Sequence, residues 1–467
     1  AMNEKKFRAV LALKIFIALL EVGLFGLVLW NDYGPMVFEQ DRWLGYLFTI
    51  VLYVIVYISL GKLFRAFKIA DYSISETIFS QVLAFGLTDL LLFVEMCLVH
   101  GGYITLVPGI ITALEQFAAA FLWALIAKRI TIVMIRPERT LIIYGDQGVE
   151  EFLVKLEKLA HIFDVQKVVS WKEIGADWRH LLDEYQAVIL YEVSLERRSA
   201  IIHYCMQKQK SLYVTPQIND IIMQGFGARH LIDTPMLKYE YHSERFGYLL
   251  FKRLSDIVVS LLVLIITSPI LAVVAIAIKA EDHGPVFYKQ KRCTKNGKVF
   301  EIIKFRSMIV DAEKEGRSIP ATKGDPRITR VGRIIRMIRV DELPQIINVL
   351  KGDMSLVGPR PERVEHVEEY TRQIPEFAYR MRVKGGLTGY AQIYGKYNTS
   401  PYDKLRLDLQ YIEKQSTLLD FKLLLLTIKI MFVPESSEGF SEAQSEQISQ
   451  EARKVDEILT EDTEKKQ

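Results

Sequence analysis

The chain has 467 residues, half of them hydrophobic, and its mean hydropathy of +0.15 is high for a soluble protein. The formal net charge is only +3, so the overall charge does not indicate a nucleic-acid-binding protein, and we expect no nucleic-acid partner. The three cysteines, Cys97, Cys205 and Cys293, lie far apart, which excludes a metal-binding spacing or a disulfide framework and fits a reducing compartment.

Four long apolar runs fill the first 135 residues and predict an α-helical membrane bundle over residues 1–136. Each run is long enough to cross a hydrocarbon core of about 30 Å. The first run, Phe7–Trp30, is too long for a cleavable signal peptide and contains Lys14 and Glu21. The other three runs cover Trp43–Leu60, Ile78–Val99 and Tyr103–Ile135.

Basic residues gather at one end of each run, whereas the alternate loops, Asn31–Arg42 and His100–Gly102, carry a single Arg between them. The positive-inside rule therefore predicts that the N-terminus and everything after Arg136 lie in the cytoplasm. The basic clusters are Lys5, Lys6 and Arg8; Lys62, Arg65 and Lys68; and Lys128, Arg129 and Arg136.

Three acidic residues, Asp89, Glu95 and Glu115, lie within the predicted spans. Buried acids in a membrane often mark a transport path. The alternative is that they pair with Lys14 inside the bundle, and the sequence leaves both interpretations open.

Alternating strand and helix patterns predict a parallel, Rossmann-like α/β domain over residues 137–240. The turn after its first strand, Gly145–Gly148, has only two glycines, so the full dinucleotide-binding fingerprint is absent. The domain is either a nucleotide-binding domain or a structural or regulatory one. The predicted strands are Thr140–Tyr144, Val165–Ser170, Ala187–Tyr191 and Ser211–Thr215, and the predicted helices are Val149–Ile162, Trp171–Asp183 and Leu195–Gln209.

A fifth apolar run, Ile257–Ile278, is long enough to span but has Ser268-Pro269 at its centre. Proline removes a helix hydrogen bond and produces a kink. Both flanks are basic, so a full span would place one basic flank outside the cell, against the charge rule. A helix–break–helix that enters and leaves by the cytoplasmic face satisfies both observations, whereas length alone allows an ordinary kinked span.

Residues 280–433 have the pattern of a compact domain that contains both strands and helices. Strand patterns at Pro285–Gln290 and Lys298–Phe305 surround an Asn296-Gly297 turn, which predicts a hairpin. Ile328–Arg339 is predicted to be a basic amphipathic helix, whose apolar face lies either in the lipid headgroup plane or in the core. The residues after Pro434 are polar, with few aromatics, and predict a disordered tail over 436–467.

The predicted helix leads directly to adjacent carboxylates, Asp341 and Glu342. Such a pair needs nearby positive charge to stay ionised, and Arg336 and Arg339 supply some of it. An ionised Asp near a phosphate can act as a nucleophile while its neighbour holds Mg²⁺. The alternative for an isolated pair is an acidic turn that caps a helix.

Two glycine-rich loops follow the acidic pair. Lys351–Pro361 places prolines on both sides of Arg360, which is suited to fixing a guanidinium for bidentate phosphate binding. Lys384–Gln392 adds hydrogen-bonding side chains. Each loop by itself is also consistent with an ordinary turn.

Taken together, these residues resemble the bacterial sugar transferase family, the monotopic phosphoglycosyl transferases. The resemblance covers about Arg253–Phe432 and is specific, because many short blocks match in one order. With the N-terminal spans and the Rossmann-like insert, the chain resembles the large subfamily that begins capsule, exopolysaccharide or O-antigen repeat units. The matching blocks are Lys252–Asp256, Lys304–Met308, Asp325–Thr329, Asp341–Gln345, Lys351–Pro361 and Gly386–Gly389.

The resemblance implies a membrane α-helical N-terminal bundle, an α/β Rossmann-like middle domain and an α+β catalytic domain over 245–435 with a re-entrant membrane helix at 253–279. It also implies transfer of a sugar-1-phosphate from a UDP-sugar to undecaprenyl phosphate, with release of UMP and Mg²⁺ as cofactor. Membrane lipid is a further expected partner, and a homo-oligomer formed through the N-terminal domains stays open.

By position, Asp341 matches the family's nucleophile, which forms a phosphosugar-enzyme intermediate, and Glu342 matches the acid that holds Mg²⁺. Ser268 and Pro269 match the break of the re-entrant helix. Arg339-Val340 departs mildly from the family's usual residues before the dyad and leaves the dyad intact. The residues expected to bind substrate or phosphate are Lys304, Arg306, Arg336, Arg360 and Gln392.

Two other functions compete with this interpretation. A polytopic transferase or transporter would work through Asp89, Glu95 and Glu115 and would need residues 1–135 for activity. A membrane-anchored scaffold would use the Rossmann-like domain to sense a nucleotide and would show no turnover. The sequence does not name the sugar.

Overall fold

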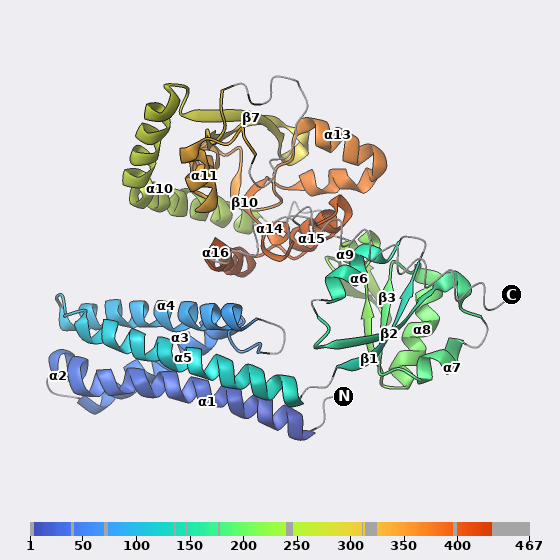
Figure 1. The fold of residues 1–467 in the computed structure, drawn as a ribbon, viewed down its shortest axis with the longest axis horizontal. Helices are drawn as coiled ribbons and strands as arrows, with labels where there is room; N and C mark the ends of the chain where they lie inside the picture. The colour runs from blue at the N-terminus through green and yellow to red at the C-terminus, as the bar shows by residue number, and fades with distance from the viewer. Residues whose placement is uncertain are drawn as a thin grey trace. The chain divides into compact units, whose positions relative to one another are not determined.

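The computed structural model describes residues 4–38, 42–69, 73–134, 137–145, 148–157, 159–175, 178–239, 246–310, 312, 325–395 and 399–431 (Figure 1). The chain divides into two compact units, Ala1–Thr215 and Pro216–Gln467. The predicted tail over 436–467 lies outside the described residues.

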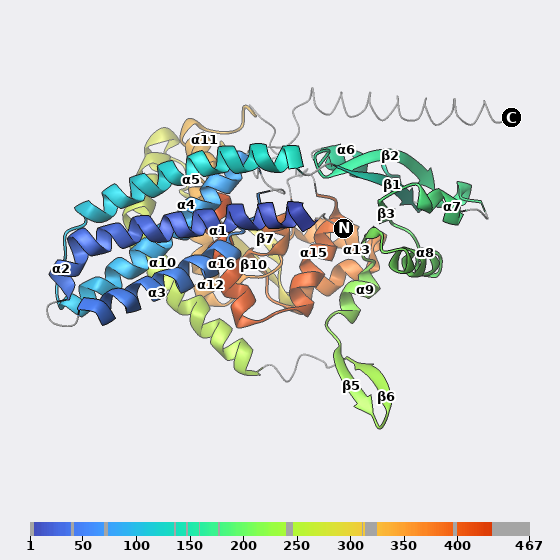
Figure 2. The same ribbon diagram turned by 90° about the horizontal axis from the view of Figure 1, so that it is seen from below.

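The first unit begins with a bundle of long helices that lie side by side in Figures 1 and 2. In the described part of the chain, five helices, one of them in the second unit, are long and apolar enough to cross a membrane, in agreement with the five predicted apolar runs. The bundle consists of α1 (Glu4–Val28), the short helices η1 (Leu29–Tyr33) and α2 (Gly34–Val37), α3 (Arg42–Leu63), α4 (Ile74–His100) and α5 (Val107–Met134).

Burial in the bundle is the reverse of that in a water-soluble protein. Leu19 and Leu98 are 67% and 77% exposed, whereas Gln81 and Gln116 are fully buried. This distribution is expected when lipid surrounds the helices, because apolar side chains then need no burial while polar groups need partners inside.

The acids of the bundle do not pair with Lys14. Among the described residues Lys14 forms no ion pair with Asp89, Glu95 or Glu115, so the predicted alternative of internal pairing is wrong. Glu115 is exposed on the surface of α5, whereas the Asp89 carboxylate is buried. The neighbour of Asp89 is another acid, Glu21 of α1.

The rest of the first unit is a four-stranded parallel sheet in the order β2-β1-β3-β4, as the alternating pattern predicted. Hydrophobic cores cover both of its faces, one around Val188 and Leu190 and the other around Ile142 and Ile189. Its elements are β1 (Glu138–Tyr144), α6 (Glu150–Glu157), β2 (Phe163–Ser170), η2 (Trp171–Glu173), α7 (Trp178–Asp183), β3 (Ala187–Tyr191), α8 (Leu195–Gln207) and β4 (Ser211–Val214).

The first glycine of the turn after β1 has a packing role. A Cβ atom on Gly145 would lie 2.0 Å from the backbone oxygen of Glu192, so only glycine allows this close approach of two chain segments. Asp146 and Gln147 of the same turn lie outside the described residues.

The second unit holds all the blocks that match the family, together with a short helix and a hairpin that the sequence did not predict. Its elements are α9 (Ile218–Met223), β5 (Gly227–Leu231), β6 (Thr234–Lys238), α10 (Phe246–Asp282), β7 (Phe287–Cys293), η4 (Lys295–Gly297), β8 (Val299–Phe305), α11 (Arg330–Met337), η5 (Val340–Gln345), α12 (Ile346–Lys351), β9 (Ser355–Val357), α13 (Val364–Gln373), η6 (Pro375–Arg382), β10 (Gly386–Thr388), α14 (Tyr390–Tyr394), α15 (Pro401–Glu413) and α16 (Thr417–Met431).

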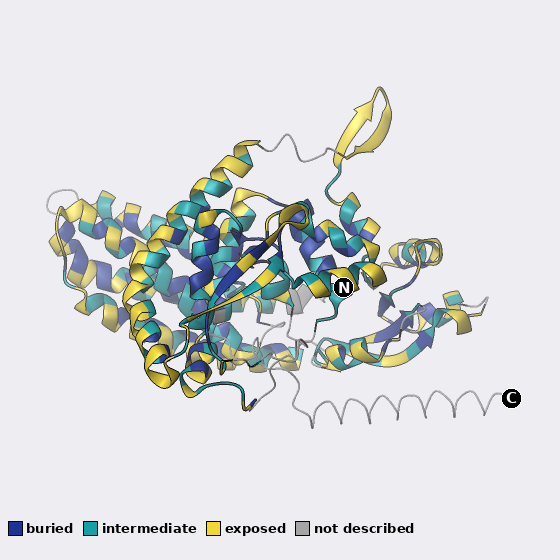
Figure 3. Ribbon diagram, turned by 90° about the horizontal axis from the view of Figure 1, so that it is seen from above, coloured by how far each residue is buried: buried dark blue, intermediate teal, exposed yellow. Residues whose placement is uncertain are grey.

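The core of this unit extends further toward the N-terminus than the predicted start at residue 245. Ile218 and Ile221 of α9 are 7% and 0% exposed, and both belong to the cluster that contains Leu405 and Leu409 of α15. The hairpin β5–β6 that follows is exposed along both strands, as the yellow colour in Figure 3 shows.

Helix α10 contains Ser268 and Pro269, where the sequence predicted a break. It continues through Pro269 and changes direction along its length, so its two limbs run differently in Figure 1. Proline leaves the carbonyl four residues earlier, that of Ile265, without its helical donor. The Ser268 hydroxyl donates to that oxygen at 2.8 Å and so satisfies it. Ile265 and Ile266 beside the bend are 68% and 73% exposed.

Candidate active site

The β7–β8 hairpin positions the first basic residue of the site. Its two strands pair antiparallel from Phe287↔Phe305 to Cys293↔Val299. Asn296 and Gly297 adopt left-handed φ values of 58° and 72°, which confirms the predicted turn. Lys304 lies near the end of β8, against which the segment that carries the acidic pair packs.

Helix α11 delivers the acidic pair as predicted. The Thr329 hydroxyl caps its first turn by accepting from the Gly332 N–H at 2.9 Å. The helix ends at Met337, and Arg339 takes a left-handed φ of 55°, which turns the chain into η5 with Asp341 and Glu342 in its first turn. Ile334 and Ile338 of the apolar face are 56% and 52% exposed, so only part of that face packs in the core.

The structure joins the two glycine-rich loops. Strands β9 and β10 pair in parallel, and the Gly358 N–H donates to the Thr388 oxygen at 2.8 Å. A Cβ on Gly386 would lie 2.1 Å from the Gly358 nitrogen, so these glycines are required by the contact between the loops. The contact fixes the backbone that leads to Arg360.

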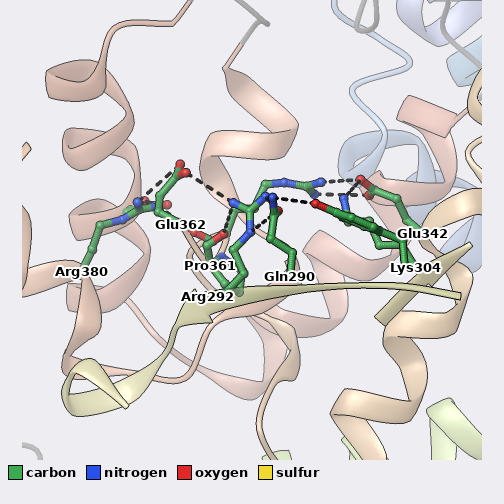
Figure 4. A network of polar contacts seen from close by, with 10 residues as sticks. Gln290, Arg292, Lys304, Glu342, Pro361, Glu362 and Arg380 are labelled. Carbon is green, nitrogen blue, oxygen red and sulfur yellow. Dashed lines mark hydrogen bonds and ion pairs between the residues drawn. The ribbon is translucent and has the colours of Figure 1, made fainter. Parts of the chain in front are cut away.

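A compact charge cluster forms where these elements meet (Figure 4). The Glu342 carboxylate accepts from Lys304 Nζ at 3.1 Å and from both terminal nitrogens of Arg360. Burial favours the protonated acid, but the Arg360 and Lys304 charges outweigh it and hold the pKa of Glu342 well below its usual range. Glu342 is therefore ionised at neutral pH.

Asp341 has a different environment. Among the described residues none donates a hydrogen bond to its carboxylate. Burial and the adjacent Glu342 charge raise the pKa of Asp341 to about 6, although Lys304, Arg336 and Arg360 act in the opposite direction. The site thus presents one carboxylate held by cations and one free to react.

A second layer of charges supports the Arg360 loop (Figure 4). Arg380 Nη2 donates to the Arg360 backbone oxygen at 3.0 Å and to Asp408 Oδ2 at 2.6 Å. Arg292 donates to the Pro361 backbone oxygen at 3.2 Å. Arg380 is 4% exposed and Asp408 fully buried. The sequence analysis did not identify either residue. The signal that could have found them is that each is a charged residue within a stretch of apolar residues.

The block Lys252–Asp256 docks the start of α10 on the second unit's core. Lys252 Nζ contacts Asp420 Oδ2 at 2.7 Å and the Val357 oxygen at 2.9 Å. Arg253 donates to the oxygens of Val349 and Leu350, both at 2.7 Å, and thereby satisfies the last turn of α12. Asp256 accepts from the Leu356 N–H at 2.9 Å. These residues anchor the helix and do not belong to the charge cluster.

Of the predicted substrate-binding residues, Lys304, Arg336 and Arg360 lie around the dyad, whereas Arg306 does not. Arg306 forms a two-pronged ion pair with Asp282, at the end of α10, and donates to the Pro285 oxygen at 2.7 Å. Its guanidinium ties α10 to β8.

Gln392 lies against the Arg360 loop. A Cβ on Gly389 would lie 2.9 Å from Gln392 Oε1 and 2.2 Å from the Gly358 oxygen, so these groups are neighbours. Both polar atoms of the Gln392 amide are buried without a hydrogen-bond partner. Because buried polar groups are nearly always paired, this amide is suited to a ligand.

The described residues around the dyad suit a metal site that is shared with the substrate phosphates. Within the described part of the chain, no group of three or more His, Cys, Asp or Glu side chains could hold a metal ion. Mg²⁺ commonly keeps several waters and binds one or two carboxylates together with substrate phosphates. Asp341 and Glu342 fit that shared arrangement, and a site made of protein ligands alone does not fit.

Comparison with known proteins points in the same direction. Residues 247–434 match the family described as Bacterial sugar transferase. A UDP-glucose:undecaprenyl-phosphate glucose-1-phosphate transferase of Klebsiella pneumoniae is 45% identical over 194 residues, which cover 40% of this chain and 42% of the relative. A UDP-N-acetylgalactosamine-undecaprenyl-phosphate N-acetylgalactosaminephosphotransferase of Aeromonas hydrophila is 42% identical over 185 residues, 39% of this chain and 44% of that protein.

A third relative is matched over most of its own length. A UDP-glucose:undecaprenyl-phosphate glucose-1-phosphate transferase of Caulobacter vibrioides is 40% identical over 192 residues, which cover 40% of this chain and 71% of that protein. The chain belongs to the bacterial sugar transferase family. It spans less than half the length of the Klebsiella and Aeromonas relatives.

Proposed function

We propose that this protein transfers a sugar-1-phosphate from a UDP-sugar to undecaprenyl phosphate and releases UMP, as the first membrane step of surface polysaccharide synthesis. One observation carries the proposal: the half-buried Asp341 carboxylate, which accepts no hydrogen bond from any described residue, lies beside Glu342, which Lys304 and Arg360 hold ionised. The printed names of the Klebsiella and Aeromonas relatives support the general reaction.

The first step is attack of an Asp341 oxygen on the β-phosphorus of the UDP-sugar. The bond from this phosphorus to the bridging oxygen breaks, and UMP leaves with that oxygen and its electron pair. The product is an acyl phosphate that joins Asp341 to the sugar phosphate. Lys304, Arg336 and Arg360 offset the negative charge of the diphosphate.

The second step regenerates the enzyme. A phosphate oxygen of undecaprenyl phosphate attacks the same phosphorus, and the bond from phosphorus to Asp341 breaks, so the carboxylate returns ionised. The products are UMP and undecaprenyl-diphosphate-sugar. Glu342 would hold Mg²⁺ together with the substrate phosphates, and the ion would supply further charge neutralisation.

The bend of α10 supports a re-entrant placement in the membrane. The Ser268 bond to Ile265 satisfies a carbonyl that would otherwise be unpaired in lipid, where each unmet backbone group costs several kcal/mol. Basic residues on both flanks favour entry and exit on the cytoplasmic side of the inner membrane. The dyad then faces the compartment that contains UDP-sugars.

The test is UMP release by the full-length protein, with undecaprenyl phosphate, across a panel of UDP-sugars. The panel is needed because the relatives differ in sugar, glucose in one and N-acetylgalactosamine in the other. Asp341→Asn, which keeps the shape but removes the charge, should abolish turnover and the phosphosugar adduct seen by intact-protein mass spectrometry. Near-normal turnover by this variant would overturn the proposal.

The metal assignment has its own test. Glu342→Gln should need a higher Mg²⁺ concentration for half-maximal turnover, whereas Glu301→Gln is the control, because Glu301 is exposed on β8 and pairs with Lys289. An unchanged Mg²⁺ dependence of the residual activity of Glu342→Gln would show that Glu342 does not hold the metal.

A further inference from the structure

Two carboxylates meet inside the N-terminal bundle, where neither has a cationic partner. Glu21 of α1 is fully buried, and both of its carboxylate oxygens lack a hydrogen-bond partner. Both carboxylate oxygens of Asp89 on α4 are buried as well, and the polar groups beside them, the Gln116 amide and the Tyr53 hydroxyl, are neutral. The two acids are close enough to interact electrostatically. Neither has an ion pair with any described Lys, Arg or His, Lys14 included.

The other two long helices complete this polar layer. Gln116 of α5 donates from its amide nitrogen to the Tyr53 hydroxyl of α3 at 2.8 Å, and Tyr53 interacts electrostatically with both acids. Gln116 is fully buried, and its amide oxygen has no donor. This neutral oxygen could therefore accept a hydrogen bond or bind a cation. The Asp89 and Gln116 side chains are neighbours.

The remaining polar groups nearby are already occupied. Tyr57, on the same face of α3 as Tyr53, donates to Gln81 Oε1 at 2.7 Å, and Gln81 donates to the Ala66 oxygen at 3.1 Å. Neither residue brings a positive charge to the acids. The layer thus has several buried acceptors and two formal negative charges, and no described Lys, Arg or His balances these charges.

Such an arrangement is costly unless a cation occupies it. An unpaired charge inside a membrane bundle costs several kcal/mol or more, and a buried acceptor without a donor adds to that cost. Two adjacent carboxylates also repel each other strongly where water does not screen them. A cation held between them removes both penalties. A proton would form hydrogen bonds to oxygens from α1, α4 and α5, and a metal ion would be coordinated by the same oxygens.

We infer that Glu21 and Asp89, with Gln116, form a cation-binding site in the core of the N-terminal bundle. The ligand is either a proton shared by the two carboxyl groups or a small monovalent metal ion bound by the same oxygens. The site is separate from the dyad of the second unit and does not depend on the proposed function.

The experiment is infrared spectroscopy of the full-length protein in lipid nanodiscs at neutral pH, in sodium buffer and in choline buffer, since a protonated carboxyl group absorbs apart from a carboxylate. The variants are Glu21→Gln, Asp89→Asn and the double variant. The control is Asp32→Asn, which removes an exposed carboxylate of η1. Circular dichroism and a thermal unfolding temperature close to the parent's check that each variant is folded.

A proton in the site predicts a protonated-carboxyl band in both buffers that is lost in Glu21→Gln or Asp89→Asn and kept in Asp32→Asn. A metal ion predicts that the band appears only in choline buffer and that the parent binds radioactive sodium, which the double variant does not. Either result supports the site. If the parent and the double variant have the same band and the same sodium binding, the inference is overturned.

Discussion

The neighbouring carboxylates Asp341 and Glu342 differ in protonation because their partners differ. Lys304 and Arg360 both contact Glu342, so its charge is neutralised directly. Asp341 receives only the more distant effect of the same cations and of Arg336, which does not cancel burial and the Glu342 charge. A nucleophile needs this combination, since a carboxylate locked in an ion pair is a weak one.

The pH dependence of turnover follows from the Asp341 pKa. Asp341 must be ionised to attack, so kcat/KM for UMP release should fall about tenfold per pH unit below a pKa of about 6. Arg336→Gln removes a charge that favours ionisation, so its profile should move to higher pH, by about one unit. A profile that is flat from pH 7 to 5 would contradict this assignment.

The same pKa makes a prediction about stability. An acid whose folded pKa is raised, here from 3.8 to about 6, destabilises the fold at pH values above that pKa, where it must be ionised while buried. Asp341→Asn should therefore raise the free energy of unfolding at neutral pH, by about 1–3 kcal/mol. Thermal unfolding at pH 7.5 and pH 5 checks this, because the gain should shrink at the lower pH. A lower Tm for the variant at pH 7.5 would be the contrary result.

At the scale of elements, the bend of α10 depends on two adjacent residues. Replacing Ser268 and Pro269 by leucine restores the helical donor and should straighten the segment, so that some molecules span the membrane. The readout is a Lys295→Cys label in the exposed β7–β8 turn, on a background without native cysteines, probed with a membrane-impermeant thiol reagent on intact cells.

In the protein with the native Ser268-Pro269, the cysteine introduced by Lys295→Cys should be protected from the reagent on intact cells. In the double leucine variant it should be partly labelled. Permeabilised cells serve as the control, because both proteins must label fully there. Labelling of the parent on intact cells would mean that α10 crosses the membrane and that the dyad lies outside the cytoplasm.

The Arg380–Asp408 pair is expected to position Arg360 through its backbone. Arg380→Lys keeps the charge but loses the planar fork that reaches Asp408 and the Arg360 oxygen together. Displacement of the loop by a fraction of an ångström should lower kcat/KM by about 10- to 100-fold. Steady-state kinetics of UMP release check this against Arg372→Lys, an exposed position on α13. Unchanged kinetics in both variants would leave Arg380 a purely structural role.

Sequence patterns located the elements of the site well, because each has a strong local signal. The Asn296-Gly297 turn, the amphipathic pattern before Asp341 and the Pro269 break all act over a few residues. Contacts between distant segments have no such signal. The pairing of Arg306 with Asp282 and of Arg380 with Asp408 depends on how α10, η6 and α15 fold together, so it could not be read from spacing.

At the scale of the whole molecule, we expect the second unit to be active without the first. The residue at which a fragment begins should then decide how stable it is. A fragment from residue 245 to 435 lacks α9, whose buried Ile218 and Ile221 each contribute about 1.5–3 kcal/mol. We predict that fragment 216–435 in nanodiscs releases UMP and unfolds at a clearly higher temperature than fragment 245–435.

Turnover and thermal unfolding of the two fragments provide the comparison, with the full-length protein as reference. If fragment 216–435 folds but releases no UMP from any UDP-sugar that the full chain accepts, the N-terminal unit is needed for catalysis. The competing interpretation, in which residues 1–135 carry the activity, would then gain support.

The long apolar runs made the membrane helices predictable, whereas the boundary between the units was not. Helix α9 has six residues, too few for a periodic pattern, and it follows the last strand of the parallel sheet directly. Its apolar residues are as consistent with the preceding domain as with the next one. Only the packing of Ile221 against the cluster of α15 assigns it to the second unit.

The position of α9 also limits how such proteins can exchange parts during evolution. A genetic crossover near residue 240 would separate α9 from the core that it completes. Gly225, just after α9, lies so close to Glu413 that a Cβ there would be 2.2 Å from its carboxylate, so a foreign sequence would clash at the same place. Hybrid proteins joined between Thr215 and Pro216 keep the core intact, and this junction is where functional chimaeras with other N-terminal modules should be found.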